Sequence, residues 1–171
     1  MDRQTRNITL SGLFMAAGVL IPMLFHGLGL GPTFLPMFWP VALGGFVLAP
    51  PFAILTGLFT PLISTLVTGM PPPPILYKMI FELSVLGGVI AWLNTKTQWG
   101  VFWVVLAGLG AALAAGLGGS ALIAPLLGLP PAFYAAATML RGIPGLATML
   151  IIIPLAVSRI RRSRILNWER G

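Results

Sequence analysis

The amino-acid sequence predicts an all-α integral membrane protein, a six-transmembrane-helix bundle in a single domain. The chain of 171 residues is 57% hydrophobic and only 8% charged, whereas a soluble domain commonly has about 25% charged residues. Apolar stretches follow one another along the chain and are separated by short polar or Gly/Pro-rich segments. Because a membrane helix needs about 20 apolar residues, this length allows about six spans joined by short loops.

The expected spans follow from the apolar runs and their breakers. They cover about 8–25, 37–48, 52–68, 75–93, 100–121 and 132–160. The first run follows Arg3 and Arg6 without a small-residue cleavage site, so we interpret it as a transmembrane helix and not as a signal peptide. Within it, Gly12 and Ala16 form a small-xxx-small pair that allows close approach of another helix.

Segment 26–40 contains three glycines and three prolines, so we expect a long external loop that folds back over the bundle. The span after it is short for a full crossing. Pro50-Pro51 indicates a tight turn before the third span, in which Pro61 predicts a kink.

Four consecutive prolines, 71–74, end the third span, and a new helix is expected from Ile75. The polar segment 94–98 separates it from the fifth span, which is rich in glycine and alanine and suited to tight packing. A second Gly/Pro-rich loop, 122–131, precedes the last span, which ends in the basic tail 159–164.

The basic residues predict the orientation. The N-terminal tail, segment 94–98 and the C-terminal tail hold eight of the ten lysines and arginines, and the loops at 26–36, 69–74 and 122–131 hold none. By the positive-inside rule, both termini lie in the cytoplasm and those three uncharged loops are external. This places the protein in a plasma membrane as a multi-pass protein. The same distribution argues against nucleic acid as the reason for the net charge of +7.

Three charged residues fall inside apolar segments: Lys78, Glu82 and Arg141. Lys78 and Glu82 are spaced i, i+4 and share one helix face. At the usual helical rise, Glu82 lies roughly 10 Å and Arg141 roughly 13 Å below the start of its span. Each charge costs about 2.5–3.5 kcal/mol at the membrane centre, which favours an inward-facing Glu82–Arg141 pair.

Two interpretations of this charge group remain open. In the first, a Glu82–Arg141 bridge only fixes the packing. In the second, two cations against one acid leave a net positive charge that receives an anionic ligand group, most simply a carboxylate, at Lys78. Lys78 reaching out to the membrane surface is the alternative to ligand contact.

Other residues near the external end are candidates for ligand contact. Phe34, Phe38 and Trp39 are suited to form an aromatic wall, although Trp39 equally suits interfacial anchoring. Met37 is a candidate contact or a packing residue. Thr33 and Tyr134 lie at the same end. His26 has no second ligand at metal spacing, so a hydrogen-bonding role is expected and a metal site is not.

Sequence motifs of enzymes are missing. The chain has no G-x-S-x-G, no H-E-x-x-H and no P-loop. Glu82 is the only acid within the apolar spans, so a membrane-embedded carboxylate pair is not available, and without cysteine there is no thiolate chemistry. The sequence therefore predicts a protein that is not an enzyme and holds no cofactor itself.

The runs LPMFWPVALGGFVLAPPFAILTGLFTPLISTLVTGMPP (35–72) and MIFEL (79–83) carry a family resemblance. Together with Ile143-Pro144-Gly145, they resemble the substrate-binding S components of energy-coupling factor (ECF) vitamin transporters. The likeness spans most of the chain. Phe38 and Lys78 depart from the family pattern, in which a histidine and a small or apolar residue are usual.

The resemblance implies a six-helix subunit that captures a vitamin or related micronutrient at its external end. It also implies partners: a membrane coupling subunit and two ATP-binding cassette ATPases, which would use the ATP. Gly12 and Ala16 match the helix-1 motif that touches the coupling subunit. The alternatives are a stand-alone small-solute carrier or channel-like protein, or a non-transporting membrane scaffold.

Overall fold

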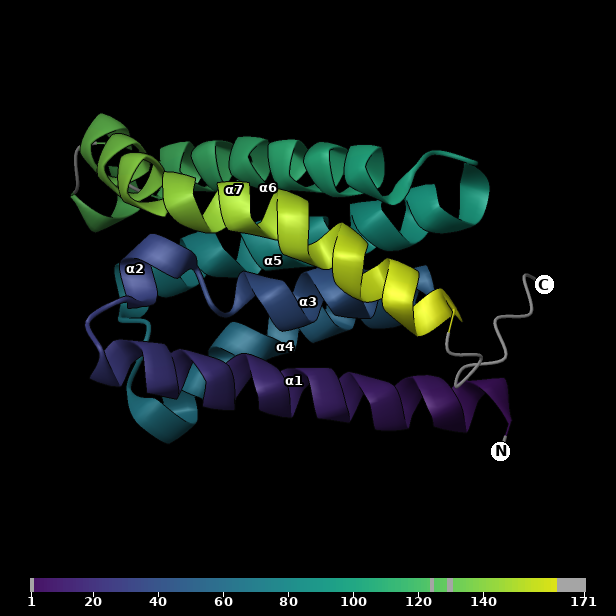
Figure 1. Cartoon of the computed structure of the whole chain (residues 1–171). Helices are drawn as coiled ribbons and strands as arrows, with labels where there is room; N and C mark the ends of the chain where they lie inside the picture. The colour runs from purple at the N-terminus through teal and green to yellow at the C-terminus, as the bar shows by residue number, and fades with distance from the viewer. Residues whose placement is uncertain (1, 124, 129–130, 163–171) are drawn as a thin grey trace.

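The computed structural model describes residues 2–123, 125–128 and 131–162, and the side chains of these residues except 74, 123, 127 and 131–140. Every regular element in the described part of the chain is helical (Figure 1). The elements are α1 (Arg3–Gly27), α2 (Gly31–Phe34), α3 (Phe38–Gly45), α4 (Pro50–Thr68), α5 (Pro73–Lys96), α6 (Val101–Ile123), η1 (Pro125–Leu127) and α7 (Pro131–Arg162).

Five of the described helices are long and apolar enough to cross a membrane: α1, α4, α5, α6 and α7. The structure therefore confirms an all-helical protein of the membrane type. The second expected span, 37–48, is a shorter helix in the structure. Helix α3 has 8 residues, which at the usual rise is roughly 12 Å and well short of the about 30 Å of a bilayer core. Gly44 and Gly45 end it early, and the turn at 46–48 follows.

Four of the prolines that sequence reasoning placed between helices begin helices instead. Pro50 and Pro51 occupy the first turn of α4, and Pro73 and Pro74 the first turn of α5. Proline is tolerated there because the first N–H groups of a helix have no partner within it. Helix α5 consequently starts two residues before the expected Ile75.

Two hydroxyl groups fix the connection between α4 and α5. Ser64 Oγ donates to the carbonyl of Met70 at 2.8 Å, and Thr65 Oγ1 donates to that of Pro71 at 3.0 Å. Gly69 has a φ of +74°, a left-handed conformation that glycine adopts at low cost. The start of α5 is thereby held against the end of α4.

Segment 26–40 is more ordered than an open loop, because it contains α2. This short helix lies directly on α7: a Cβ atom on Gly145 would come within 2.8 Å of the carbonyl oxygens of Thr33 and Phe34. The expectation that this segment folds back over the bundle is confirmed, and the glycine of α7 is what permits the contact.

Glycines also set the distance between α4 and α5. A Cβ atom on Gly87 of α5 would lie 2.6 Å from the carbonyl oxygen of Ala53, and one on Gly57 of α4 would lie 2.6 Å from the nitrogen of Ser84. On α6, Gly108 faces Ile90 of α5 in the same manner. The small residues thus let the helix backbones touch, as expected for helices that pack in a membrane.

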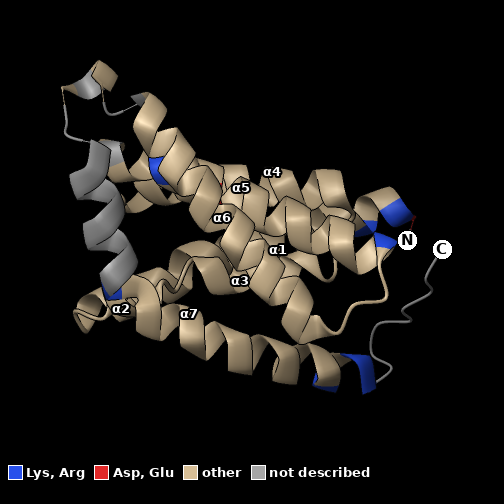
Figure 2. Cartoon of the chain, turned by 90° about the horizontal axis from the view of Figure 1, so that it is seen from above, with Lys and Arg blue, Asp and Glu red and all other residues tan. Residues whose placement is uncertain are grey.

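Helix α1 begins and α7 ends at the same end of the molecule, on the right in Figure 1, whereas α2 lies at the other end. We call the first the basic end. Figure 2 shows most lysines and arginines there. The described ones at the termini of α1, α5 and α7 are Arg3, Arg6, Lys96, Arg159, Arg161 and Arg162.

Candidate functional site

The most unusual feature of the interior is an ion pair inside α5. Lys78 Nζ lies 2.9 Å from Glu82 Oε1, and the two side chains are only 11% and 3% exposed. Glu82 lies roughly 13 Å along α5 from Pro73 at the usual helical rise. Two charges are therefore enclosed within a largely apolar bundle, one turn apart on one helix.

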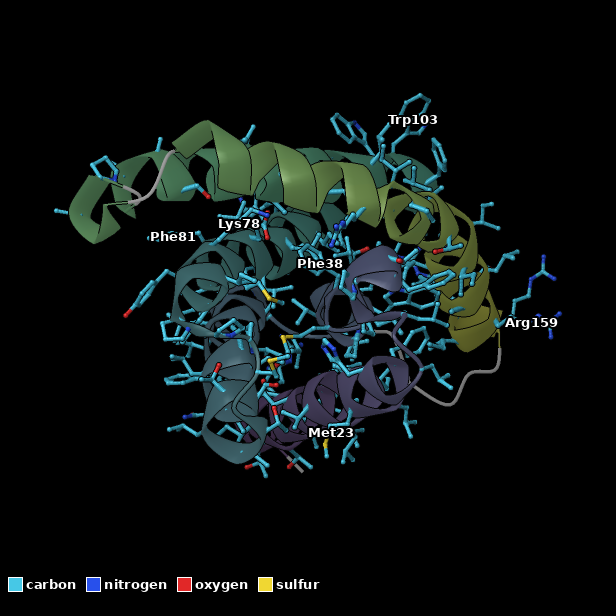
Figure 3. All side chains as sticks on the ribbon, turned by 90° about the vertical axis from the view of Figure 1, so that its left-hand side faces the viewer. Met23, Phe38, Lys78, Phe81, Trp103 and Arg159 are labelled. Atoms are coloured by element: carbon cyan, nitrogen blue, oxygen red, sulfur yellow. The ribbon has the colours of Figure 1, made fainter. Side chains whose placement is uncertain are left out.

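The surroundings of the pair come from α6. A Cβ atom on Gly116 would collide with the Glu82 side chain, at 2.6 Å from its Cδ. Gly119, almost one turn further on, makes room in the same way for Phe81. Figure 3 looks along the bundle from the α2 end: Lys78 lies inside the ring of helices, as does Phe38, while Phe81 points outward.

The expected pairing of Glu82 with Arg141 was wrong. Glu82 is bonded to Lys78, and Arg141 is exposed. The reason is the face of α7. Among the described side chains of α7, the buried ones are Gly142, Gly145, Met149, Ile153 and Val157. Arg141 precedes the first of these by one residue, which turns it by about 100° at 3.6 residues per turn. Spacing along the chain does not fix the direction in which a side chain points.

The alternative in which Lys78 reaches the membrane surface is also contradicted. Its side chain is almost as buried as that of Glu82, and its ammonium group points at the carboxylate. An i, i+4 pair with the glutamate C-terminal to the lysine forms within one helix without help from a second one. The ion pair between Lys78 and Glu82 therefore lies within α5 itself.

The proposed aromatic wall is divided between core and surface. Met37 and Phe38 are 4% and 3% exposed and belong to the main hydrophobic core. Trp39 is half-buried, and its indole Nε1 donates to the carbonyl of Phe34 at 2.9 Å. The Phe34 ring lies 5.9 Å from that of Phe25. These contacts tie the start of α3 to α2 and to the end of α1.

His26 packs against the start of α2. A Cβ atom on Gly31 would lie 2.6 Å from His26 Cε1, so the imidazole covers the buried Gly31 while remaining exposed itself. Thr33 is half-buried on α2. The side chain of Tyr134 lies outside the described residues. Among the described residues, no three histidine, cysteine or acidic side chains gather as metal ligands.

Leu35 is a residue of this region that sequence reasoning missed. It has a φ of +48° at the end of α2, an uncommon conformation for a residue with a side chain. A Cβ atom on Gly142 would lie only 2.9 Å from Leu35 Cδ1, so the Leu35 side chain packs on α7. The glycines at 142 and 145, three residues apart beside Pro144, were the available signal for this contact.

Gly12 and Ala16 lie on the outer face of α1. Both are exposed, and a Cβ atom on Gly12 would meet nothing within 4 Å. They do not pack against the described helices of this chain. Large apolar side chains surround them on the same helix: Ile8, Leu13, Leu20, Met23 and Leu24 are all at least half exposed.

The described site therefore contains an enclosed cation–anion pair on α5, with α2 resting on α7 at the same end of the bundle. Comparisons with protein-family models, with curated proteins and with solved structures found no match for this chain.

Proposed function

We propose that this protein is the substrate-binding S component of an ECF-type importer, with six membrane passages formed by the five long helices and by the α2–α3 segment. It captures a small, vitamin-like micronutrient at the α2 end, which faces outward. Both termini are cytoplasmic in the plasma membrane of a prokaryote. The chain itself catalyses no reaction.

The observation that carries the proposal is the buried Lys78–Glu82 pair. Ionisable side chains within a membrane bundle are costly and mark substrate or ion pathways. Contact with a polar ligand would give these enclosed charges a function at the α2 end of the bundle. An ammonium group donates strong hydrogen bonds to carboxylates, so Lys78 is the member of the pair that would contact a ligand carboxylate. The exposed Arg141 adds positive charge at the same end.

Two further features support the proposed assembly. The outer face of α1 presents Gly12 and Ala16 without steric cover, which suits close approach by a helix of a membrane coupling subunit. Two ATPase subunits acting on that coupling subunit would supply the energy from ATP, since no nucleotide-binding motif occurs in this chain.

The test of ligand class is mass spectrometry of small molecules that copurify with the wild-type protein. We expect a carboxylate-bearing compound that is retained by the wild type and lost on Lys78→Met. Copurification of two ATPases with a coupling subunit supports the importer, whereas uptake into vesicles that contain this chain alone would establish a stand-alone carrier instead.

The coupling role of α1 gives a separate prediction. Gly12→Leu and Ala16→Leu should abolish most transport in cells that supply the partner subunits, because a bulky side chain prevents close helix approach. Ligand affinity of the isolated subunit should stay near the wild-type value. Gly118→Leu is the matched control, since Gly118 is equally exposed with open space around it, but on α6. Equal transport by the Gly12 variant and this control would exclude α1 as the contact.

A further inference from the structure

The charges enclosed within the described bundle cancel each other. Lys78 and Glu82 are 11% and 3% exposed, and they lie side by side with Nζ 2.9 Å from Oε1. Arg141, the other charged residue that the structure describes at the α2 end, is exposed. An apolar interior tolerates such a pair because each charge has its opposite alongside. A ligand that entered this enclosure as a plain anion would therefore leave one net negative charge inside the bundle.

This charge balance limits which carboxylate-bearing ligands fit. An uncompensated charge within a membrane bundle is costly, whereas a ligand with a protonated nitrogen as well as a carboxylate adds no net charge. Glu82 can receive that nitrogen, because a carboxylate accepts several hydrogen bonds and its described polar partner is Lys78 alone. Gly116 of α6, which packs against the Glu82 carboxyl, has no side chain to donate. The enclosure consequently favours a zwitterion over a simple acid.

The placement of both charges on α5 allows them to exchange partners. Lys78 carries its ammonium group on a flexible four-carbon stem, and Figure 3 shows that it lies inside the ring of helices. A ligand nitrogen can replace Nζ at Glu82 while Nζ pairs with the ligand carboxylate, so no spare donor on Lys78 is required and no helix has to move. Because Nζ and Oε1 lie 2.9 Å apart, the two ligand charges must be similarly close, as they are in an α-amino acid.

We propose that this site takes an amino-acid-like zwitterion, with its ammonium group at Glu82 and its carboxylate at Lys78. The inference rests on the proposed function and narrows its ligand from any carboxylate-bearing compound to one with an adjacent protonated nitrogen. Each of the four charges then has an opposite charge beside it. A plain carboxylic acid, or an amine without a carboxylate, leaves one charge in the enclosure unpaired.

Thermal unfolding of the full-length protein in detergent micelles tests this with three matched pools of small molecules. The first pool holds the natural amino acids with uncharged side chains, the second the same skeletons without the amino group, and the third the same skeletons without the carboxylate. Only the first should raise the Tm of the wild type. Removing either charge from the best amino acid should weaken its binding about tenfold or more, the loss of one charge-assisted hydrogen bond. Lys96→Gln, which removes an exposed cation at the basic end, should respond like the wild type.

Two variants show whether both protein charges are recognised. Glu82→Gln should lose the response to amino acids. Lys78→Met/Glu82→Gln leaves no charge uncompensated in the interior, so it should fold and still fail to respond; a wild-type response of this variant would overturn the proposal. An equal or larger rise in Tm with the second pool, or tighter binding of a carboxylic acid by Glu82→Gln, would assign a plain anion and overturn the zwitterion while leaving the proposed function in place. No response to any pool would also overturn the zwitterion, whereas the proposed function fails separately, if no small molecule copurifies with the wild type.

Discussion

Lys78 and Glu82 show what residue spacing predicts and what it does not. Their i, i+4 spacing already placed them on one helix face, and the structure joins them at 2.9 Å. The inferred pairing of Glu82 with Arg141 required knowledge of how α7 is rotated, which depends on where Gly142 and Gly145 contact α2. That information lies in contacts between distant segments. Spacing therefore identified the charged residues and misassigned the partner.

Removing one member of the pair should be more costly than removing both. Glu82→Gln leaves the ammonium of Lys78 enclosed without its anion, and Lys78→Met leaves the carboxylate without its cation. Breaking a buried pair from one side costs about 3–5 kcal/mol. Lys78→Met/Glu82→Gln together should lose less than the sum of the two. The measurement is the free energy of unfolding by SDS titration in mixed micelles.

Arg141→Gln is the control for this cycle. Arg141 is exposed, and exposed substitutions usually change stability by less than about 0.5 kcal/mol. Strict additivity of the Lys78 and Glu82 variants would mean that the two charges do not interact, and a large loss in Arg141→Gln would restore the pairing that the structure contradicts.

At the scale of single elements, the glycines and alanines predicted helix packing correctly, whereas the prolines did not predict where the helices begin. The Gly/Ala-rich run of the fifth expected span predicted tight packing, and Gly108, Gly116 and Gly119 of α6 do face side chains of α5. The prolines before α4 and α5 were expected to lie outside the helices, and Pro71 and Pro72 do. The other four form the first turns of α4 and α5 instead, because proline lacks only an N–H that the helix would leave unpaired.

The contact between α4 and α5 can be tested at Gly57. A Cβ atom there would collide with the backbone of Leu83 and Ser84, so Gly57→Ala should push the two helices apart. We expect a loss of stability of about 1–3 kcal/mol, as for other overpacked interiors. Gly118→Ala is the matched control, because its Cβ meets nothing within 4 Å. It should be neutral or stabilising by up to about 1 kcal/mol, the helix-propensity difference between glycine and alanine. Equal effects of the two variants would mean that α4 and α5 do not touch at Gly57.

At the scale of the whole molecule, composition was sufficient to predict a helical membrane protein, because a chain with so few charges lacks a soluble surface. The path through the bundle was harder to predict. The α2–α3 segment has neither the length nor the continuity of a membrane helix, yet α1 begins and α7 ends at one end of the molecule (Figure 1). Its shape depends on α2 resting on α7, a contact between residues more than 100 positions apart in the sequence.

The orientation of the molecule is the last prediction, and single cysteines test it because the chain has none of its own. Leu28 and Leu126 are 73% and 83% exposed at the connections that lack charge, whereas Gln4 and Gln98 are exposed near the basic residues. If the positive-inside rule holds, an impermeant thiol reagent added to intact cells should label Leu28→Cys and Leu126→Cys. It should label Gln4→Cys and Gln98→Cys only after the membrane is opened. Both leucines lie on ordinary backbone, unlike the neighbouring Gly29 and Gly128, whose φ values of +70° and +65° would strain a cysteine. Labelling of Leu28→Cys without Leu126→Cys would mean an odd number of passages between them, so the α2–α3 segment would not count as a crossing.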